Sequence, residues 1–438
     1  MIITDIFKLL LSNRRRCVVI VILLLYMNEC SSFQKYNVKK SCISNSRLKL
    51  TSPTEYGVVY DLSQYKPLVE SSLTVASVIA IHELGHFYAA RLQNMKVMSF
   101  NIGYGPKLIS FKDKYDTEFN LRSLPLGGYV AFPQDVEVDA ATGEVIGEID
   151  DPNLLQRRPP WQRAIVISGG VLANILLTFI LSASTSYVSG IGHPTFAPGI
   201  VITQAPGIDT PGAAAGLQTK DIILEVNGKV LPASDFATEE FVRVARNNAN
   251  KPMNMIVKRN DKLITLQGSP NEKGVLGIRV NNVVESVNVE KSSNLFEAIK
   301  IGVDETGRLI YITASSFVRA IQGGLTGNEI GGPIAVVKTG ADLAGVSNIA
   351  LVGFAATLSI NLALINSLPF PALDGGQLLF VLIEIITGTP VNRNIKDTIT
   401  ALAFSILLYL GITSFVGDFT RINNSVQPTS INQIQKIP

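Results

Sequence analysis

The chain has 438 residues, with 38 lysines and arginines against 35 aspartates and glutamates, so its formal net charge is only +3. Charged residues make up 17% of the chain, which is low for a soluble globular protein, and the mean hydropathy is positive. This composition predicts several membrane spans and a soluble module. The small basic excess lies mostly in the first fifty residues, which argues against a nucleic-acid partner.

The first 32 residues have the layout of a secretory signal peptide. Three arginines, 14–16, precede an apolar run over 17–27 that is too short to span a membrane comfortably, and the small residues Cys30, Ser31 and Ser32 follow it. We therefore expect residues 1–32 to be removed as a signal peptide, which leaves Phe33 near the new N-terminus.

Residues 33–54 look like a second targeting segment. They contain five basic residues and several serines but no acidic residue, as transit peptides do. The order signal then transit resembles the leader of proteins sent to plastids of secondary origin, and it predicts a plastid membrane, either the chloroplast envelope or the thylakoid. The alternative is an ordinary signal peptide followed by a basic linker, which would leave the protein in the endomembrane system.

The three cysteines of the chain all belong to this leader: Cys17, Cys30 and Cys42. Once the leader is removed, the protein has no thiol. Neither a disulfide nor a cysteine-ligated metal can then be part of the mature protein.

Four apolar segments follow, at about 68–91, 163–189, 349–386 and 400–417. They predict a multi-span α-helical membrane protein with about four transmembrane helices, arranged as a first half over 68–190 and a second half over 349–420, with a polar tail over 421–438. The third segment is interrupted by Pro369 and Pro371. Non-helical backbone is tolerated at membrane depth only where it is buried in protein or lines a wet cavity.

The polar region between the two halves predicts an inserted α+β domain over 196–284. It has short β-type runs around one helix expected at 236–248. Its segment 206–217, followed by 221–228, resembles a PDZ domain of the bacterial protease type, which implies binding of an extended peptide by strand addition. It has no clear Gly-Leu-Gly-Phe carboxylate loop. An amphipathic connecting segment is expected over 294–345, and short hairpins near the membrane over 98–132.

The first apolar segment carries His82-Glu-Leu-Gly-His86. Histidines at i and i+4 project from one face of a helix, so both can direct a ring nitrogen at one zinc ion, while Glu83 flanks the ion and can take a proton from water. Ionisable groups at membrane depth are costly unless a partner or a metal compensates. Zn²⁺ is the expected cofactor, and a third protein ligand must come from elsewhere.

The broken third segment supplies a candidate in Asp374, within Asn366-Ser-Leu-Pro-Phe-Pro-Ala-Leu-Asp374-Gly-Gly. An acid flanked by apolar residues needs a partner, and His82 and His86 are the obvious one. Two plainer interpretations remain open. Asp374-Gly-Gly alone would more often be a helix-capping turn, and Asn366 could cap the backbone freed by Pro369.

With these motifs in order, the chain resembles the site-2 proteases, and most closely their bacterial and plastid branch of RIP zinc metalloproteases. The resemblance runs from about 68 to 420 and also includes 100–106, 125–130, 161–164 and 331–334. It implies metal-dependent cleavage of single-span membrane protein substrates within the bilayer. It also implies His82, His86 and Asp374 as zinc ligands, Glu83 as the base and Asn366 as a substrate or oxyanion contact. Where many relatives have Gly-Pro, this chain has Gly170-Val171.

Two other residues receive plain interpretations. His193 is expected to be an interfacial turn residue, and Glu384 to be solvated or capping. Two other functions stay open: a catalytically silent membrane scaffold that binds peptides through its PDZ-like domain, and a zinc transporter or sensor. Glu83 argues against the first, since a silent relative has no use for a base.

Overall fold

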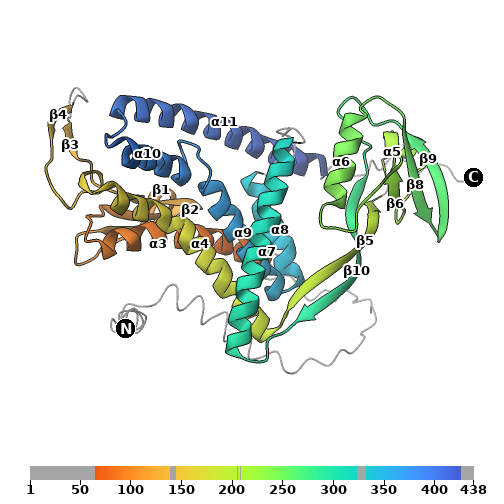
Figure 1. The fold of residues 1–438 in the computed structure, drawn as a ribbon, viewed down its shortest axis with the longest axis horizontal. Helices are drawn as coiled ribbons and strands as arrows, with labels where there is room; N and C mark the ends of the chain where they lie inside the picture. Colours follow the sequence, from red (N-terminus) through yellow and green to blue (C-terminus); the bar gives the residue numbers. More distant parts are fainter. Residues whose placement is uncertain (1–64, 139–144, 205, 208, 323–331, 426–438) are drawn as a thin grey trace, which may run out of the picture. The chain divides into compact units, whose positions relative to one another are not determined.

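The computed structural model describes residues 65–138, 145–204, 206–207, 209–322 and 332–425. The expected leader over 1–54 with its three cysteines, and residues 426–438 of the expected tail, lie outside the described residues. Within them, four helices are long and apolar enough to cross a membrane, as expected: α3 (Lys66–Leu92), α4 (Pro160–Val188), α9 (Asn348–Asn366) and the part of α11 (Arg393–Ser425) that ends at Phe419. Figure 1 shows α3, α4 and α9 grouped together.

Helices α3 and α4 approach each other closely because glycine faces glycine where they cross. A Cβ added to Gly169 of α4 would lie 2.5 Å from the carbonyl oxygen of Gly85 in α3 and 3.0 Å from the Cβ of Ala89. Small residues at such a crossing let the two backbones approach, which is the usual way that membrane helices pack. Gly85, the glycine of the His-Glu-Leu-Gly-His motif, therefore brings α4 close to the two histidines.

The third apolar segment is two helices rather than one. Helix α9 ends at Asn366, and α10 (Asp374–Thr387) begins after the break that contains both prolines. The break makes its own backbone hydrogen bonds, from Phe370 N to Leu368 O at 2.7 Å and from Leu373 N to Phe370 O at 2.8 Å. The break sets Asp374 at the first residue of a helix.

Strands β1 (Ser99–Lys112) and β2 (Glu118–Ala131) make a small sheet after α3, in the region expected to form hairpins. Both strands bend. Residues 99–102 run parallel to 118–121 and antiparallel to 128–131, and 107–112 run antiparallel to 118–122. Phe87 of α3 packs against Phe100 and Phe119 of this sheet. The contact holds the sheet against the helix that carries the histidines.

The inserted domain is a six-stranded antiparallel sheet in the order β10-β5-β6-β8-β9, with β7 paired to β6. Its strands are β5 (Ile191–Gln204), β6 (Ile222–Val226), β7 (Lys229–Val230), β8 (Met253–Arg259), β9 (Lys262–Gly268) and β10 (Arg279–Glu290), and its helices are α5 (Pro211–Ala214) and α6 (Ala237–Asn247). Its core includes fully buried Ile200, Ile223 and Met255. The paired ends of β5 and β10 extend past the expected limits 196 and 284 as a two-stranded ribbon.

Two further helices connect this domain to the second half: α7 (Leu295–Gln322) and α8 (Pro333–Val346). Buried Asp418 of α11 accepts hydrogen bonds from the backbone N–H groups of Gly332 and Ala335, so it caps the start of α8.

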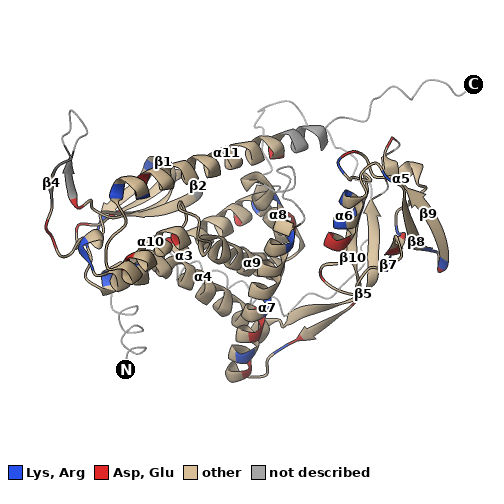
Figure 2. Ribbon diagram, turned by 45° about the horizontal axis from the view of Figure 1, so that its top comes forward, with Lys and Arg blue, Asp and Glu red and all other residues tan. Residues whose placement is uncertain are grey.

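The short elements β3 (Val136–Val138), β4 (Val145–Glu148) and the 3-10 helix η2 (Leu155–Arg157) precede α4. Figure 2 shows almost no charge along α4 and α9, whereas α6 carries both signs.

Candidate metal centre

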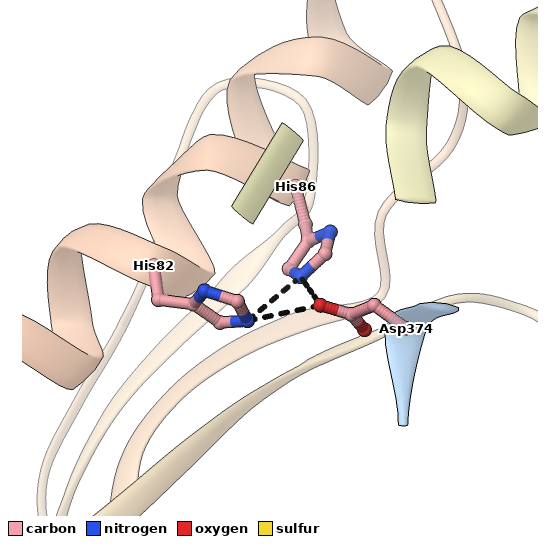
Figure 3. A group of neighbouring side chains, drawn as sticks. All are labelled: His82, His86 and Asp374. Atoms are coloured by element: carbon pink, nitrogen blue, oxygen red, sulfur yellow. Dashed lines mark hydrogen bonds and ion pairs between the residues drawn. The ribbon is translucent and has the colours of Figure 1, made fainter. Parts of the chain in front are cut away.

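The two histidines of the motif lie on one face of α3 and are both buried, as the spacing predicts (Figure 3). Their Nε2 atoms are 3.3 Å apart. Two imidazole nitrogens this close, one helical turn apart, point toward one small volume between the rings. The sequence prediction of a two-histidine half-site in a membrane-spanning helix is consistent with this geometry.

Asp374 reaches the same volume from the start of α10. Its Oδ2 atom lies 3.1 Å from Nε2 of His82 and 3.2 Å from Nε2 of His86 (Figure 3). The alternative that Asp374 merely caps a helix is wrong: Leu373 is the N-cap of α10, and no side chain caps this end of the helix. The structure therefore brings together the three residues that the sequence singled out as ligands, from two helices far apart in the chain.

The donor set fits a zinc ion. One nitrogen of each histidine and one carboxylate oxygen all lie within 4.8 Å of one another. Asp374 Oδ2 is buried and has no hydrogen-bond partner among the described residues, although two ring nitrogens surround it. Three groups that converge their lone pairs on one point need a cation there. Two imidazoles and a carboxylate are ligands that zinc prefers, and three protein ligands leave a position open for water, as in catalytic zinc sites.

The outer side of each ring contacts α4. Nδ1 of His86 lies 2.9 Å from the carbonyl oxygen of Val166, so this nitrogen carries the proton and Nε2 keeps its lone pair. Nδ1 of His82 lies 3.3 Å from the side-chain amide of Asn174. Between these contacts, a Cβ on Gly170 would lie 2.6 Å from Cε1 of His82, so only glycine leaves room for the ring.

Glu83 follows His82 and is partly buried against the small sheet rather than between the rings. Its Cγ lies 3.0 Å from where a Cβ on Gly128 of β2 would be. Glu83 therefore flanks the centre from the side of the sheet, as the motif predicts for a residue outside the ligand set.

Asn366 is the last residue of α9, and its amide Nδ2 lies 3.4 Å from Nε2 of His82. This amide points at the candidate metal centre. Its position is consistent with the substrate or oxyanion contact that the resemblance to the site-2 proteases implies for Asn366. Among the described residues, no hydrogen bond from the Asn366 side chain to the backbone around Pro369 is found. The capping alternative therefore has no support in the described structure.

Two interpretations of single residues were wrong. His193 lies in strand β5, paired with Asn288 of β10, rather than in a turn, because the ribbon continues beyond the expected domain limit. Glu384 is neither solvated nor a side-chain cap: it forms an ion pair with Arg163 of α4, and each side chain is only 16% exposed. The sequence around Glu384 is apolar and gives no sign of this partner, because Arg163 lies in another span.

The sequence analysis missed the residues of α4 that face the rings: Val166, Gly170 and Asn174. They lie four residues apart and therefore share one face of the helix. The amide of Asn174, four residues after a glycine in a span whose other polar residues between 165 and 185 are only serine and threonine, was the signal that could have found them.

The apolar helices and the buried two-histidine, one-aspartate site define a membrane-embedded metallohydrolase. The model of peptidase family M50, the site-2 protease family, matches residues 71–410, and the chain belongs to this family. It is a zinc-dependent metalloendopeptidase of membranes.

Named relatives agree with this assignment. The chain is 38% identical over 351 residues to a protein of Synechocystis sp. named "Putative zinc metalloprotease slr1821", and the alignment covers 78% of this chain and 92% of that protein. It is 31% identical over 369 residues to "Membrane metalloprotease ARASP, chloroplastic" of Arabidopsis thaliana, covering 82% and 80%. The relatives therefore include cyanobacterial and chloroplastic proteins.

Proposed function

We propose that the chain is an intramembrane endopeptidase that cleaves single-span membrane proteins within or next to their transmembrane segment. The observation that carries the proposal is the convergence of His82, His86 and Asp374, from two helices, on one buried point. A hydrolytic site at this depth is useful only for a peptide bond that also lies in the bilayer. This makes regulated intramembrane proteolysis the natural role.

In the proposed mechanism His82, His86 and Asp374 hold zinc, which when bound supplies the Lewis acidity that brings the pKa of water toward neutrality. Glu83 accepts the proton of the attacking water and returns it to the leaving amine as the C–N bond breaks. Asn366 donates its amide N–H to the substrate carbonyl oxygen, where negative charge develops.

The test is cleavage of a fluorogenic single-span peptide by the full-length protein in lipid vesicles. Glu83→Gln should lower turnover by about 10²- to 10⁴-fold and keep the metal, because an amide cannot accept the proton. Glu70→Gln, the same change on the same helix away from the centre, is the control. Undiminished cleavage by Glu83→Gln, or cleavage that survives a chelator, would contradict the mechanism.

A scaffold, transporter or sensor has less support. Glu83 and Asn366 flank the three candidate ligands, and neither is needed by a protein that only stores or moves zinc. Hydrolysis uses all five residues: three as metal ligands, Glu83 as the base and Asn366 as the contact to the substrate carbonyl oxygen.

We propose further that residues 196–284 are a PDZ-like domain that binds extended peptide and filters substrates by the size of their soluble parts. Support comes from the sheet: among the described residues β10 ends the strand order, beside α6, and pairs with β5 along one edge only, so its other edge can take an added strand. Thr238 N donates to Asn282 Oδ1 at 2.9 Å, which fixes α6 against β10.

The ribbon provides a clean way to test the filter. Ala197 and Val283 are partners across β5 and β10, so replacing 198–282 by Asn-Gly closes the ribbon as a tight hairpin. This variant should keep its zinc and cleave substrates that carry large soluble domains. If it keeps zinc but has the size limit of the full-length protein, the filter proposal is wrong and the domain docks a partner.

For the location, we propose a plastid membrane, either the envelope or the thylakoid. The two-part leader over 1–54 and the relative named chloroplastic support this proposal. The endomembrane system is the alternative that a reporter fusion distinguishes.

A further inference from the structure

The candidate ligand His82 has one ring nitrogen toward Asp374 and the other toward Asn174 of α4. Nε2 lies 3.1 Å from Oδ2 of Asp374, and Nδ1 lies 3.3 Å from the Asn174 amide. Asn174 is completely buried, in a helix that is otherwise apolar at this level. A buried amide in a membrane span is costly unless its hydrogen bonds are made.

The orientation of this amide decides which nitrogen of His82 carries the proton. With Nδ2 toward the ring, the amide donates to Nδ1, and the proton must sit on Nε2, which faces the carboxylate and the other histidine. The buried Oδ1 then has no partner among the described residues. Half a turn about Cβ–Cγ exchanges oxygen and nitrogen without changing the shape of the side chain.

With Oδ1 toward the ring, the orphaned oxygen accepts the Nδ1 proton of His82, and the Nε2 lone pair is free for a metal. The same arrangement holds for His86, whose Nδ1 faces the carbonyl oxygen of Val166 at 2.9 Å. A metal-bound histidine usually donates its second N–H to such an acceptor, which fixes its tautomer and orientation.

We infer that Asn174 is a positioning residue for zinc: its Oδ1 accepts the Nδ1 proton of His82 and holds the ring with Nε2 toward the metal. The inference rests on the proposed ligand role of His82. It assigns to α4 an orienting partner for each histidine, Val166 and Asn174, two turns apart on the face that also presents Gly170.

The backbone at Asn174 is itself held firmly. Its carbonyl oxygen accepts a hydrogen bond from Ser359 Oγ of α9 at 2.9 Å and from Thr178 Oγ1 at 3.1 Å. Thr178 also reaches the carbonyl oxygen of Ala356 in α9. These bonds tie α4 to α9 at this level, so the amide is presented to His82 from a fixed position.

The test measures zinc affinity, by competition with a graded series of chelators, in the full-length protein. Asn174→Leu keeps the branching at Cγ and removes the acceptor, and zinc affinity should fall about 10- to 100-fold. Asn174→Asp keeps an oxygen acceptor at the same place and should stay within a few fold of wild type. Ser182→Ala, which changes another buried polar residue two turns further along α4, is the matched control and should bind zinc like wild type.

A second readout follows the proton directly. The chain has only three histidines, so ¹⁵N-histidine labelling resolves His82. The zinc-loaded wild type should show a slowly exchanging proton on Nδ1 of His82, and Asn174→Leu should lose it while His86 keeps its own. A merely structural role for Asn174 would move neither signal selectively.

The outcomes separate this inference from the ligand assignment. Zinc binding as tight as wild type in Asn174→Leu, or an equal loss in Asn174→Asp and Asn174→Leu, would overturn the inference alone. Full zinc binding in His82→Ala would overturn the ligand assignment and the inference with it.

Discussion

Oδ2 of Asp374 lies 3.1 Å from Nε2 of His82, although the inserted domain and two spanning helices separate the two residues in the chain. Helix α4 makes this contact possible. It packs on α3 through Gly85 and Gly169 and on α9 through Thr178, so the two halves of the site meet across one helix. Substitutions in α4 should therefore alter the metal centre although none of them replaces a candidate ligand.

Gly170→Ala is the sharpest change of this kind. The new methyl group would lie 2.6 Å from Cε1 and 2.8 Å from Nε2 of His82, so the ring has to move. Overpacking of this kind typically costs about 1–3 kcal/mol, and we expect zinc affinity to fall at least tenfold. Gly345→Ala, where a Cβ meets nothing within 4 Å, is the control. Chelator competition measures both, and equal affinities would show that the ring tolerates the methyl group.

The ion pair between Arg163 and Glu384 should hold α10 against α4 and so keep Asp374 in place. Both side chains are largely buried, and Lys396 lies near enough to feel both charges. A double-mutant cycle with Arg163→Met and Glu384→Gln should give a coupling energy of about 0.5–3 kcal/mol in thermal unfolding. Glu384→Gln should also weaken zinc binding. Additive effects of the two changes would mean that the pair does not act as a unit.

The stability of the inserted domain should depend on pH through Asp221. This carboxylate is buried, and burial raises its pKa, but hydrogen bonds from Arg259 and from the backbone N–H of Gln218 outweigh that effect and hold the pKa below the ordinary 3.8. Because the folded pKa is the lower one, the stabilisation is complete above the unfolded value. It is lost as the pH falls through the folded pKa.

Removing this carboxylate tests the pair. Asp221→Ala should lower the unfolding free energy of the domain by about 1.5–3 kcal/mol at pH 7, because it removes the carboxylate that accepts hydrogen bonds from Arg259 and from the backbone N–H of Gln218. Asp261→Asn, which breaks the exposed ion pair with Lys258 and keeps a residue type that tolerates the positive φ of 61° at this position, should change the unfolding free energy by less than about 1 kcal/mol. Calorimetry of the full chain measures both. Equal losses, or an acid sensitivity that Asp221→Ala retains, would refute the assignment.

The leader makes a separate prediction about location. A reporter fused to residues 1–54 should enter a plastid, whereas one fused to residues 1–32 should stop in the secretory pathway. The difference arises from the basic, acid-free segment that begins at Phe33. Fluorescence microscopy of the two fusions shows in which compartment each reporter accumulates. Retention of the longer fusion in the endoplasmic reticulum would favour the endomembrane alternative.

Sequence reasoning found what depends on local spacing. The i, i+4 histidines follow from the geometry of one helix, and Asp374 follows from the need of an acid in an apolar segment for a partner. It could not find what depends on how helices cross. The roles of Gly170 and Asn174 exist only because Gly85 and Gly169 bring α3 and α4 together, which is a property of the packed structure.

The same limit explains the errors. The sequence predicts a solvated or capping Glu384 because its partner, Arg163, lies in another span, and ion pairs between distant segments leave no local pattern. His193 was placed in a turn because Gly192 and Pro194 flank it, yet pairing with β10 keeps it in a strand. In each case a long-range contact outweighed the local signal.

The central claim is that His82, His86 and Asp374 together bind the zinc ion that Glu83 uses. The most direct measurement is the zinc content per chain of Asp374→Ala, purified in parallel with Asp397→Asn as a control on an exposed acid nearby. We predict about one zinc per chain in the control and wild type, and a large loss in Asp374→Ala, since two histidines alone make an incomplete site. Full zinc occupancy in folded Asp374→Ala would contradict this prediction and show that the third ligand lies elsewhere.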